Sequence, residues 1–517
     1  MGHPVSPFDG TVSFALNGQP LSGDAGFTQS LDIERIEVLR GPQNILFGRS
    51  SQGGTINIVP NLPDWQRERR VAAQLGSDGQ YLTDLIVGDA ITDGVAARAA
   101  VRFAGADGYM DNVGTGNELG RNRLGAARGS VTFDLGYWTT LTATGYVERD
   151  RMRGATWVLR EGPHESWLDK DPDATRRLRI GGLELKHAFR AFDLTASLGF
   201  QDIRLEQSTP TIDAHIYSQV LGVPASALVG LSSTNWAENE THERAWSGEI
   251  RLTAPEASAW RWATGLSAYT SEVDRYGVQR SSLAATGNGL HDGSLELTTF
   301  SAFGEIGIPF TDRFTFTPGL RIGRDRIRYA NRFDSQGAPG LVPEFEEHDT
   351  WSETWITGGA GVDYRLLEDV LVYGSVKRGH SSGGFSSVNE NAGFGVPLQP
   401  YEASTSWTYE LGTRAALMDG AVAVSAAAFF NDVRKGHLQS YDLLTYHRVV
   451  VPIDYETYGF ETDARAQFAD GWSLFSGLGY TRAELKNVPS DEPAGARDGN
   501  RVPGAGMDRN LRAGEPF

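Results

Sequence analysis

The sequence predicts an all-β protein: a transmembrane antiparallel β-barrel. Segments of alternating polar and apolar residues follow one another from about residue 67, whereas segments with the α-helical period are almost absent. Glycine (62 residues) and the aromatic residues (12 Trp, 17 Tyr and 24 Phe) are abundant. The mean hydropathy is nevertheless −0.33, which is typical of a membrane barrel because its strands show lipid only every second side chain.

Composition limits the function classes. No apolar run approaches the ~18 residues that a membrane helix needs. The net charge of −18 argues against nucleic acid as a partner, and the absence of cysteine excludes a disulfide framework. Residues 1–4 carry neither the basic nor the apolar segment of a signal peptide. Since a barrel of this kind must be exported, we expect the natural start to lie upstream.

The stretch from Leu31 to Pro60 predicts a short hairpin punctuated by glycines. Residues 36–40 are expected to form a strand, which ends at Gly41 and Pro42 because proline fixes φ and has no N–H for a ladder. Residues 44–47 are too few for a stable helix and predict a tight connector. Residues 55–59 alternate as a second strand. Positive φ angles are expected at the glycines of this stretch, which are Gly48, Gly53 and Gly54.

The barrel strands are predicted from period-two alternation. In residues 95–103, 314–322 and 355–365, an apolar set alternates with a set that includes Arg98, Arg321 and other polar residues. The apolar set should face lipid and the polar set a wet lumen. A soluble sandwich with one solvated face is the alternative, but the number and length of these strands disfavour it.

The connections between the strands alternate in length. Short turns are predicted at residues 89–94, 135–137, 190–192, 254–258, 309–312, 367–369, 418–420 and 469–471. Longer polar connections are predicted around residues 105–120, 150–175, 206–241, 273–294, 329–350, 380–401 and 434–455. Tight periplasmic turns opposite long external loops are the rule for outer-membrane barrels. We count about 17 strands.

The sequence of the stretch from Leu31 to Pro60 also resembles that of a known protein family. It reads IERIEVLRGPQ…LFGRSSQGGTINIV and resembles the plug-domain signature of TonB-dependent outer-membrane receptors. Further similar phrases lie at residues 376–385, 401–432 and 458–463, so that the resemblance runs from about Asn17 to Asn487. The signature residues are Arg40, Gly41, Pro42, Gly48, Gly53, Gly54 and Asn57.

The resemblance implies a division of the chain. Residues 1–64 are expected to be the C-terminal part of the plug and residues 65–487 an incomplete barrel. Residues 488–517 show no alternation and are expected to be an irregular tail. The chain then reads as truncated at both ends relative to a barrel of 22 strands, which would make the barrel open or strained, with the first strand, near residues 67–77, unable to pair normally with the last.

The resemblance also implies a contact between plug and barrel. In the family, plug arginines meet glutamates of the barrel wall, and here Arg40 matches the former while Glu410 and Glu461 fall on the polar register of their strands. We call this predicted contact the charge latch. The alternative is that both glutamates point into water and bind nothing. The residues that contact the transported substrate cannot be assigned.

No catalytic residue and no metal site is assigned. Residues 379–383 match the GxSxG motif, but the helix that a nucleophile elbow requires does not follow. Acidic residues and a histidine cluster within residues 344–349, and charge runs of this kind are usually a solvated loop rather than a metal site. His437 and His447 share a loop, with nothing to fix their separation. No cofactor is expected.

The implied function is energy-coupled import through the outer membrane of a Gram-negative bacterium. The expected partners are a ferric siderophore or a similar large ligand, a TonB-type energy-coupling complex and outer-membrane lipid, with the receptor acting as a monomer. A passive porin-like or structural barrel, a surface hydrolase on a barrel scaffold and a non-transporting gene fragment are the alternatives. Fold alone does not choose the ligand.

Overall fold

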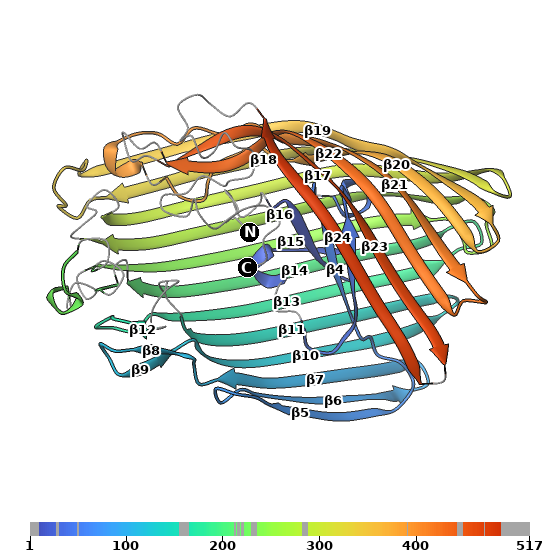
Figure 1. Cartoon of the computed structure of the whole chain (residues 1–517), viewed down its shortest axis with the longest axis horizontal. Helices are drawn as coiled ribbons and strands as arrows, with labels where there is room; N and C mark the ends of the chain where they lie inside the picture. Colours follow the sequence, from blue (N-terminus) through green and yellow to red (C-terminus); the bar gives the residue numbers. More distant parts are fainter. Residues whose placement is uncertain are drawn as a thin grey trace.

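The computed structural model describes residues 10–486, apart from residues 27–29, 49–50, 155–164, 211–212, 215–217, 219–221, 229–234, 282–287, 390, 442–447 and 470. A large curved sheet surrounds a small four-stranded sheet, which lies in the lumen (Figure 1). The predicted tail, residues 488–517, lies outside the described residues. In the described part of the chain, no helix is long and apolar enough to span a membrane.

The large sheet contains the 17 strands that the alternation predicted. Each strand pairs antiparallel with the next barrel strand in the sequence. The barrel strands are β5 (Glu68–Leu75), β6 (Tyr81–Thr92), β7 (Val95–Ala106), β10 (Arg121–Gly136), β11 (Thr139–Arg153), β13 (Asp173–Ala188), β14 (Asp193–Pro210), β15 (Trp236–Thr253), β16 (Arg261–Arg280), β17 (Gly289–Thr311), β18 (Phe314–Asp334), β19 (Glu344–Leu367), β20 (Val370–Ser381), β21 (Ser404–Leu417), β22 (Val422–Tyr441), β23 (Arg448–Ala469) and β24 (Trp472–Lys486).

The short turns and the long connections lie at opposite rims, as predicted (Figure 1). The exception is the connection of β5 to β6, which spans only residues 76–80 at the rim of the long connections. Asp78 and Gly79 have positive φ there, so the chain reverses within a few residues. Small elements decorate the same rim: β8 (Met110–Asn112), β9 (Asn117–Leu119), β12 (Glu165–Ser166), η1 (Ala225–Ala227) and η3 (Ala392–Phe394).

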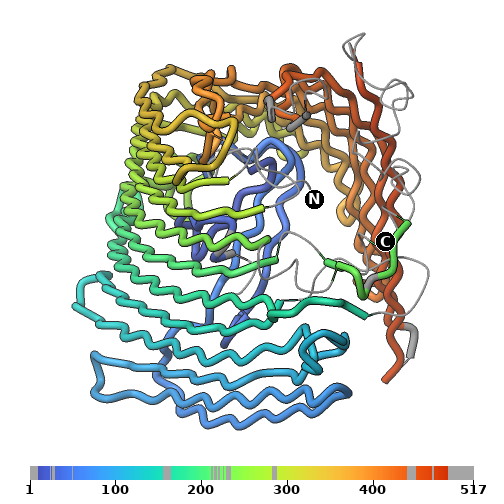
Figure 2. Tube along the Cα trace, turned by 90° about the vertical axis from the view of Figure 1, so that its left-hand side faces the viewer, coloured from blue at the N-terminus to red at the C-terminus, as the bar shows by residue number. Residues whose placement is uncertain are grey.

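β24 lies beside β5 in the ring of strands, but the two are not joined as the other neighbours are. The strands alternate in direction and their number is odd, so the first and the last strand run in the same direction and cannot pair antiparallel. Among the described residues, paired positions are found between all other neighbours but not between β24 and β5, as expected for a first strand that cannot pair normally with the last. Residues 69–75 and 472–482, on the two sides of this junction, are exposed. In Figure 2 the first barrel strands (blue) lie below the lumen and the last strand (red) lies to its right.

The outer face of the barrel is apolar, as the alternation predicted. Phe103, Leu320 and Ile356 are exposed on it, whereas Arg98, Arg321 and other members of the opposite register are buried. A further set of exposed aromatic residues lies at or beside the short turns, where a membrane barrel places its periplasmic girdle. This set contains Tyr137, Trp138, Phe189, Trp260, Phe310 and Trp472.

The lumen is not polar throughout, which corrects our expectation. On the external half of the wall, inward side chains from β15 to β18 form an apolar cluster that includes Tyr269, Leu295 and Tyr329. The connection after β20 folds inward and caps this cluster. Phe385 stacks on Tyr329 with ring centroids 5.1 Å apart, and Leu398 packs against the same group. Apolar inward residues are stable here because protein, rather than water, covers them.

The small sheet has the order β2-β1-β4-β3. Its strands are β1 (Val12–Leu16), β2 (Gln19–Leu21), β3 (Ile33–Arg40) and β4 (Gly54–Pro60). β3 and β4 are the predicted hairpin pair and run antiparallel, whereas β1 and β4 are parallel. Asn17 and Gly18 both have positive φ and make the tight turn from β1 to β2.

The predicted connector between β3 and β4 contains a single helical turn, α2 (Asn44–Phe47). This corrects our expectation that these residues are too few to form a helix. Isolated short helices are unstable, and contacts with the barrel wall, described below, account for this one. A second short helix, α1 (Gly23–Gly26), follows β2.

Candidate functional site: the plug–barrel interface

The most deeply buried ion pair between the small sheet and the barrel joins Asp32 to Arg98. Asp32 precedes β3 and accepts two hydrogen bonds from the guanidinium of Arg98 on β7, Nε to Oδ2 at 2.6 Å and Nη2 to Oδ1 at 2.8 Å. The side chains are 1% and 6% exposed. Arg98 also pairs with Glu68 of β5 at 2.6 Å. This bidentate contact fixes the short-turn end of the small sheet to the wall.

Two barrel arginines hold the helix α2. Arg321 of β18 donates from Nη1 to the carbonyl of Ile45 at 3.0 Å, and Arg251 of β15 donates from Nη2 to that of Leu46 at 3.1 Å. Cations suit these carbonyls because a helix leaves its last C=O groups unpaired. Gly48, with a φ of 67°, lies so close to Arg321 that a Cβ would stand 2.8 Å from its Nη2.

The segment around α2 also contacts β20 and β21. Asn44 donates from Nδ2 to the carbonyl of His380 at 3.1 Å. Gln52 donates to Ser404 at 3.1 Å, at the loop-rim end of β21. Pro42 lies against Gly379, where a Cβ would approach it to 3.2 Å. Residues 41–48 and 51–53 therefore lie beside the loop-rim ends of β20 and β21, and we call them the apex.

The other signature residues serve the small sheet itself. Gly54 has positive φ, as predicted, and a Cβ on it would collide with the carbonyl of Leu39. Gly41 also has positive φ, which was not predicted, whereas the prediction for Gly53 was wrong. Asn57 accepts from the backbone N–H of Gly18 at 2.9 Å and donates to Glu37 at 2.8 Å. It thereby ties β4 to the β1–β2 turn and to β3.

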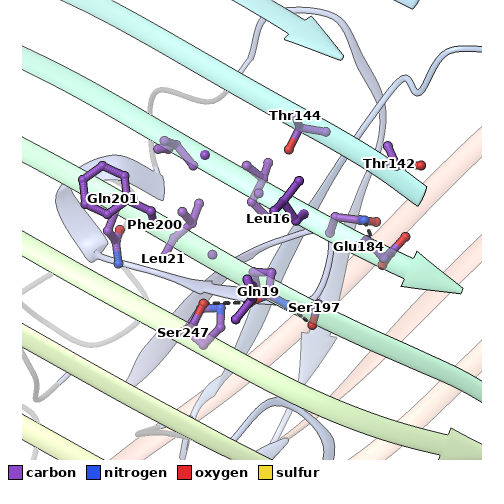
Figure 3. A pocket seen from close by; sticks show the side chains of 18 of the residues that line it. Leu16, Gln19, Leu21, Thr142, Thr144, Glu184, Ser197, Phe200, Gln201 and Ser247 are labelled. Atoms are coloured by element: carbon purple, nitrogen blue, oxygen red, sulfur yellow. Dashed lines mark hydrogen bonds between the residues drawn. The ribbon is translucent and has the colours of Figure 1, made fainter. Parts of the chain in front are cut away.

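A pocket separates the β1–β2 hairpin from the wall (Figure 3). Hydrogen bonds cross it from Gln19 to Ser197 and from Ser247 to Gln19, the latter at 2.7 Å. Ser22 donates its N–H to Gln201 at 3.0 Å. Polar groups facing the hairpin come from β11, β13, β14 and β15, and include Thr142, Thr144, Glu184, Ser197, Gln201 and Ser247. Apolar residues, among them Leu16, Leu21 and Phe200, line the same pocket, so this side of the interface is mixed.

Arg40 lies against Glu461. Its Nη1 contacts Oε2 of that carboxylate, on β23. The Arg40 side chain is 57% exposed and that of Glu461 26%, so water reaches the pair. In the part of the chain that the structure describes, Arg40 forms no ion pair with Glu410. Of the three residues named for the charge latch, the fold therefore brings two together.

Electrostatics within the small sheet favour an ionised Glu37. The hydrogen bond from Asn57 and the neighbouring Arg35 guanidinium hold the pKa of Glu37 below its usual value, against a smaller opposing effect of burial. Arg35 lies 2.7 Å from Glu37 and also pairs with Glu34. Arg35 thus serves β3 alone, whereas Arg40 reaches the barrel.

The acidic run at residues 344–349 is part of β19, not a loop. Alternate side chains point to opposite faces of a strand, so the run cannot converge on one ion. Glu347 points inward, where it accepts from Tyr329 at 2.9 Å, from Asn389 at 2.7 Å and from the N–H of Leu398 at 2.8 Å. It anchors the connection after β20. Glu346 instead pairs with Arg332 at 3.5 Å.

The structure also bears on the remaining candidates, the GxSxG match and the two histidines. The GxSxG match spans the end of β20, and in the described residues no α-helix follows it directly. His437 Nε2 lies 2.7 Å from the carbonyl oxygen of Glu402, and His447 lies outside the described residues. Sequence reasoning missed Asp32 and Arg98. Their only signal was the inward register of Arg98, which does not indicate a partner 66 residues away.

A barrel with an apolar outer band and a small mixed sheet tied into its lumen is a plugged outer-membrane barrel. Family models agree with this class. Residues 68–509 match the TonB dependent receptor-like β-barrel, and residues 5–55 match the TonB-dependent receptor plug domain. The chain belongs to the TonB-dependent receptors, proteins of the Gram-negative outer membrane.

Individual relatives cover most of the chain. The pesticin receptor of Yersinia enterocolitica is 24% identical over 97% of this chain and 71% of its own length. The probable TonB-dependent siderophore receptor PiuA of Acinetobacter baumannii is 21% identical over 91% and 68%. The crystal structure of the ferric yersiniabactin uptake receptor FyuA from Yersinia pestis superimposes with a TM-score of 0.81, at 20% identity over 94% of this chain and 72% of the other.

Proposed function

We propose that this receptor imports a ferric siderophore across the outer membrane. Residues 1–64 act as the plug and residues 65–487 as the barrel, in a monomer that draws energy from a TonB-type complex. The relatives above include receptors named for a siderophore and for ferric yersiniabactin uptake, and this likeness supports the substrate class.

The external half of the lumen supports a ligand with anionic groups. Arg275 of β16 offers an exposed guanidinium there, which donates to Ser387 at 2.6 Å. A guanidinium binds carboxylate or phenolate oxygens. The inward aromatic side chains of Tyr269, Tyr329 and Phe385 are covered by the connection after β20 and are not part of this surface.

The observation that carries the proposal is that hydrogen bonds and ion pairs join the plug to the wall at separate points, beside an apolar contact of Ala25 and Leu31 with the wall. Water can replace the polar contacts when the plug moves. The pair of Arg40 and Glu461 is solvated and on its own stabilises the docked plug by about 1 kcal/mol or less. The charge latch therefore releases easily and serves to fix the plug's position between import cycles.

A passive pore is the second candidate, and the plug disfavours it. The small sheet occupies the lumen and is bonded to strands on several sides of the wall. Diffusion of solutes would require the plug to move without an energy source, although the buried Asp32–Arg98 pair opposes this.

Uptake of radiolabelled ferric siderophores by cells that lack their own siderophore receptors tests the proposal. We expect binding at the cell surface, and uptake that a protonophore abolishes. Arg40→Ala should keep binding and change the uptake rate, and the charge exchange Arg40→Glu with Glu461→Arg should restore it. Arg35→Ala is the matched control because Arg35 pairs only within β3. Uptake that continues after the proton gradient is dissipated would support the passive pore instead.

A further inference from the structure

Three metal-ligand side chains from neighbouring strands converge on the lumen wall beside the apex. They are Asp325 of β18, Glu353 of β19 and His380 of β20. Their ligand atoms all lie within 4.8 Å of one another, and His380 Nε2 is 3.3 Å from Glu353 Oε1. Asp325 and His380 are only 3% and 5% exposed.

The imidazole has an unused ligand atom. His380 Nε2 is buried and has no hydrogen-bond partner among the described residues, although it points at the two carboxylates. A buried polar atom without a partner is costly in a folded protein. The ring itself is held in place, since it stacks on Trp355 with centroids 5.4 Å apart.

The two carboxylates lack a compensating cation. In the described part of the chain, neither Asp325 nor Glu353 lies within ion-pair distance of a lysine or arginine. Both are instead oriented by neutral donors. Thr299 donates to Asp325 Oδ1 at 2.8 Å and Ser382 to Oδ2 at 2.5 Å, while the N–H of Gly383 donates to Glu353 at 3.1 Å. Each oxygen keeps a lone pair for a cation.

We propose that Asp325, Glu353 and His380 form a binding site for a divalent first-row transition metal of the Zn²⁺ type. One imidazole nitrogen and two carboxylate oxygens suit Zn²⁺, Co²⁺ or Mn²⁺, whereas Ca²⁺ and Mg²⁺ prefer oxygen ligands alone. The neutral donors listed above are the outer hydrogen bonds that orient metal ligands. Bonds of ~2.1 Å set ligand atoms about 3.4 Å apart, so small side-chain rotations complete the site.

The metal would join three strands and steady the apex. It ties β18, β19 and β20 together at one level of the wall. Asn44 of α2 donates to the backbone carbonyl of His380, so a fixed His380 also fixes the contact with the plug. This site holds a bare ion in a buried position and is separate from the proposed siderophore site, which lies in the open lumen.

The test uses the purified full chain in detergent, stripped with a chelator and titrated with Zn²⁺ alone and with Co²⁺ alone. We expect one metal per chain by calorimetry, a higher midpoint of thermal unfolding with Zn²⁺, and d–d absorption with Co²⁺. His380→Gln, Glu353→Gln and Asp325→Asn should each weaken binding by at least about tenfold. His242→Gln should not, since His242 pairs with only one carboxylate, Asp202, at 3.0 Å.

Two results would overturn the proposal. One is a wild-type chain that binds neither ion at stoichiometric concentration, whatever the variants do. The other is binding that survives in every folded variant of the three ligands, which would mean that the ion sits elsewhere. Because siderophore uptake plays no part in these readouts, their failure leaves the proposed import function untouched.

Discussion

Asp32 and Arg98 form a contact between plug and wall from which water is nearly excluded. We expect Asp32→Asn to destabilise the docked plug by about 3 kcal/mol, because the variant leaves a buried guanidinium with a weaker partner. Glu68 still pairs with Arg98 in this variant, so the expected loss of stability is at the lower end of the range for buried ion pairs. Hydrogen exchange of the β3 and β4 amides measures the effect.

The control for this variant is Asp89→Asn, which breaks the exposed pair of Asp89 with Arg67. That change should have little effect on stability, because water screens an exposed ion pair. Equal effects of the two variants on β3 and β4 would show that the Asp32 pair does not hold the plug.

Gly48 combines a left-handed backbone with a close neighbour. Gly48→Ala should lower the stability of the apex by more than the roughly 1–2 kcal/mol of a left-handed alanine, because its Cβ also displaces Arg321 from the carbonyl of Ile45. Gly420→Ala is the matched control, with a φ of 84° and open space around it. Limited proteolysis compares the two, and cleavage of the apex no faster than in the control would contradict the clash.

At the scale of elements, period-two alternation predicted the barrel strands well. The pattern in residues 314–322 continues through β18, where Arg321 is buried and Leu320 and Ile322 are exposed. It could not predict the inward aromatic cluster, since a period fixes which face a side chain takes but not what covers that face. The same limit applies to residues 344–349, which we expected to form a loop. They lie on a strand above the membrane, where charged outward residues resemble those of a loop.

The candidate site was only partly predictable. Arg40 and Glu461 were named from the resemblance, and the fold places them in contact. Asp325, Glu353 and His380 were not grouped, because strand neighbours in a barrel come from positions far apart in the sequence. No local spacing marks such a cluster, and the register of β18, β19 and β20 alone brings it together.

The pairing of β3 with β4 should depend on pH through Glu37. Its pKa is lower in the folded plug than in the unfolded chain, so its contribution to stability is present above the unfolded value of about 4.3. That contribution is lost as the pH falls through the folded pKa. Hydrogen exchange of the β3–β4 amides should therefore speed up at acid pH, less so in Glu37→Gln. Glu34→Gln serves as the control, and identical pH profiles in all three proteins would contradict this role of Glu37.

At the scale of the whole molecule, the barrel is a continuous wall of paired strands, whereas few buried charges hold the plug inside it. Antiparallel ladders continue from β5 to β24, whereas the plug is fixed at separate points near Asp32, α2 and Arg40. Import therefore requires that the contacts between plug and barrel break while the barrel strands stay paired.

A disulfide between plug and wall tests this central claim most directly. The chain has no cysteine, and a Cβ at Gly379 would lie 3.3 Å from that of Pro42, close to the spacing of a disulfide. The Ser406 hydroxyl must rotate aside. In oxidised cells, Pro42→Cys with Gly379→Cys should bind the ferric siderophore but not import it, and a reductant should restore uptake to the level of the single variants. Full uptake with the cross-link complete would contradict the account.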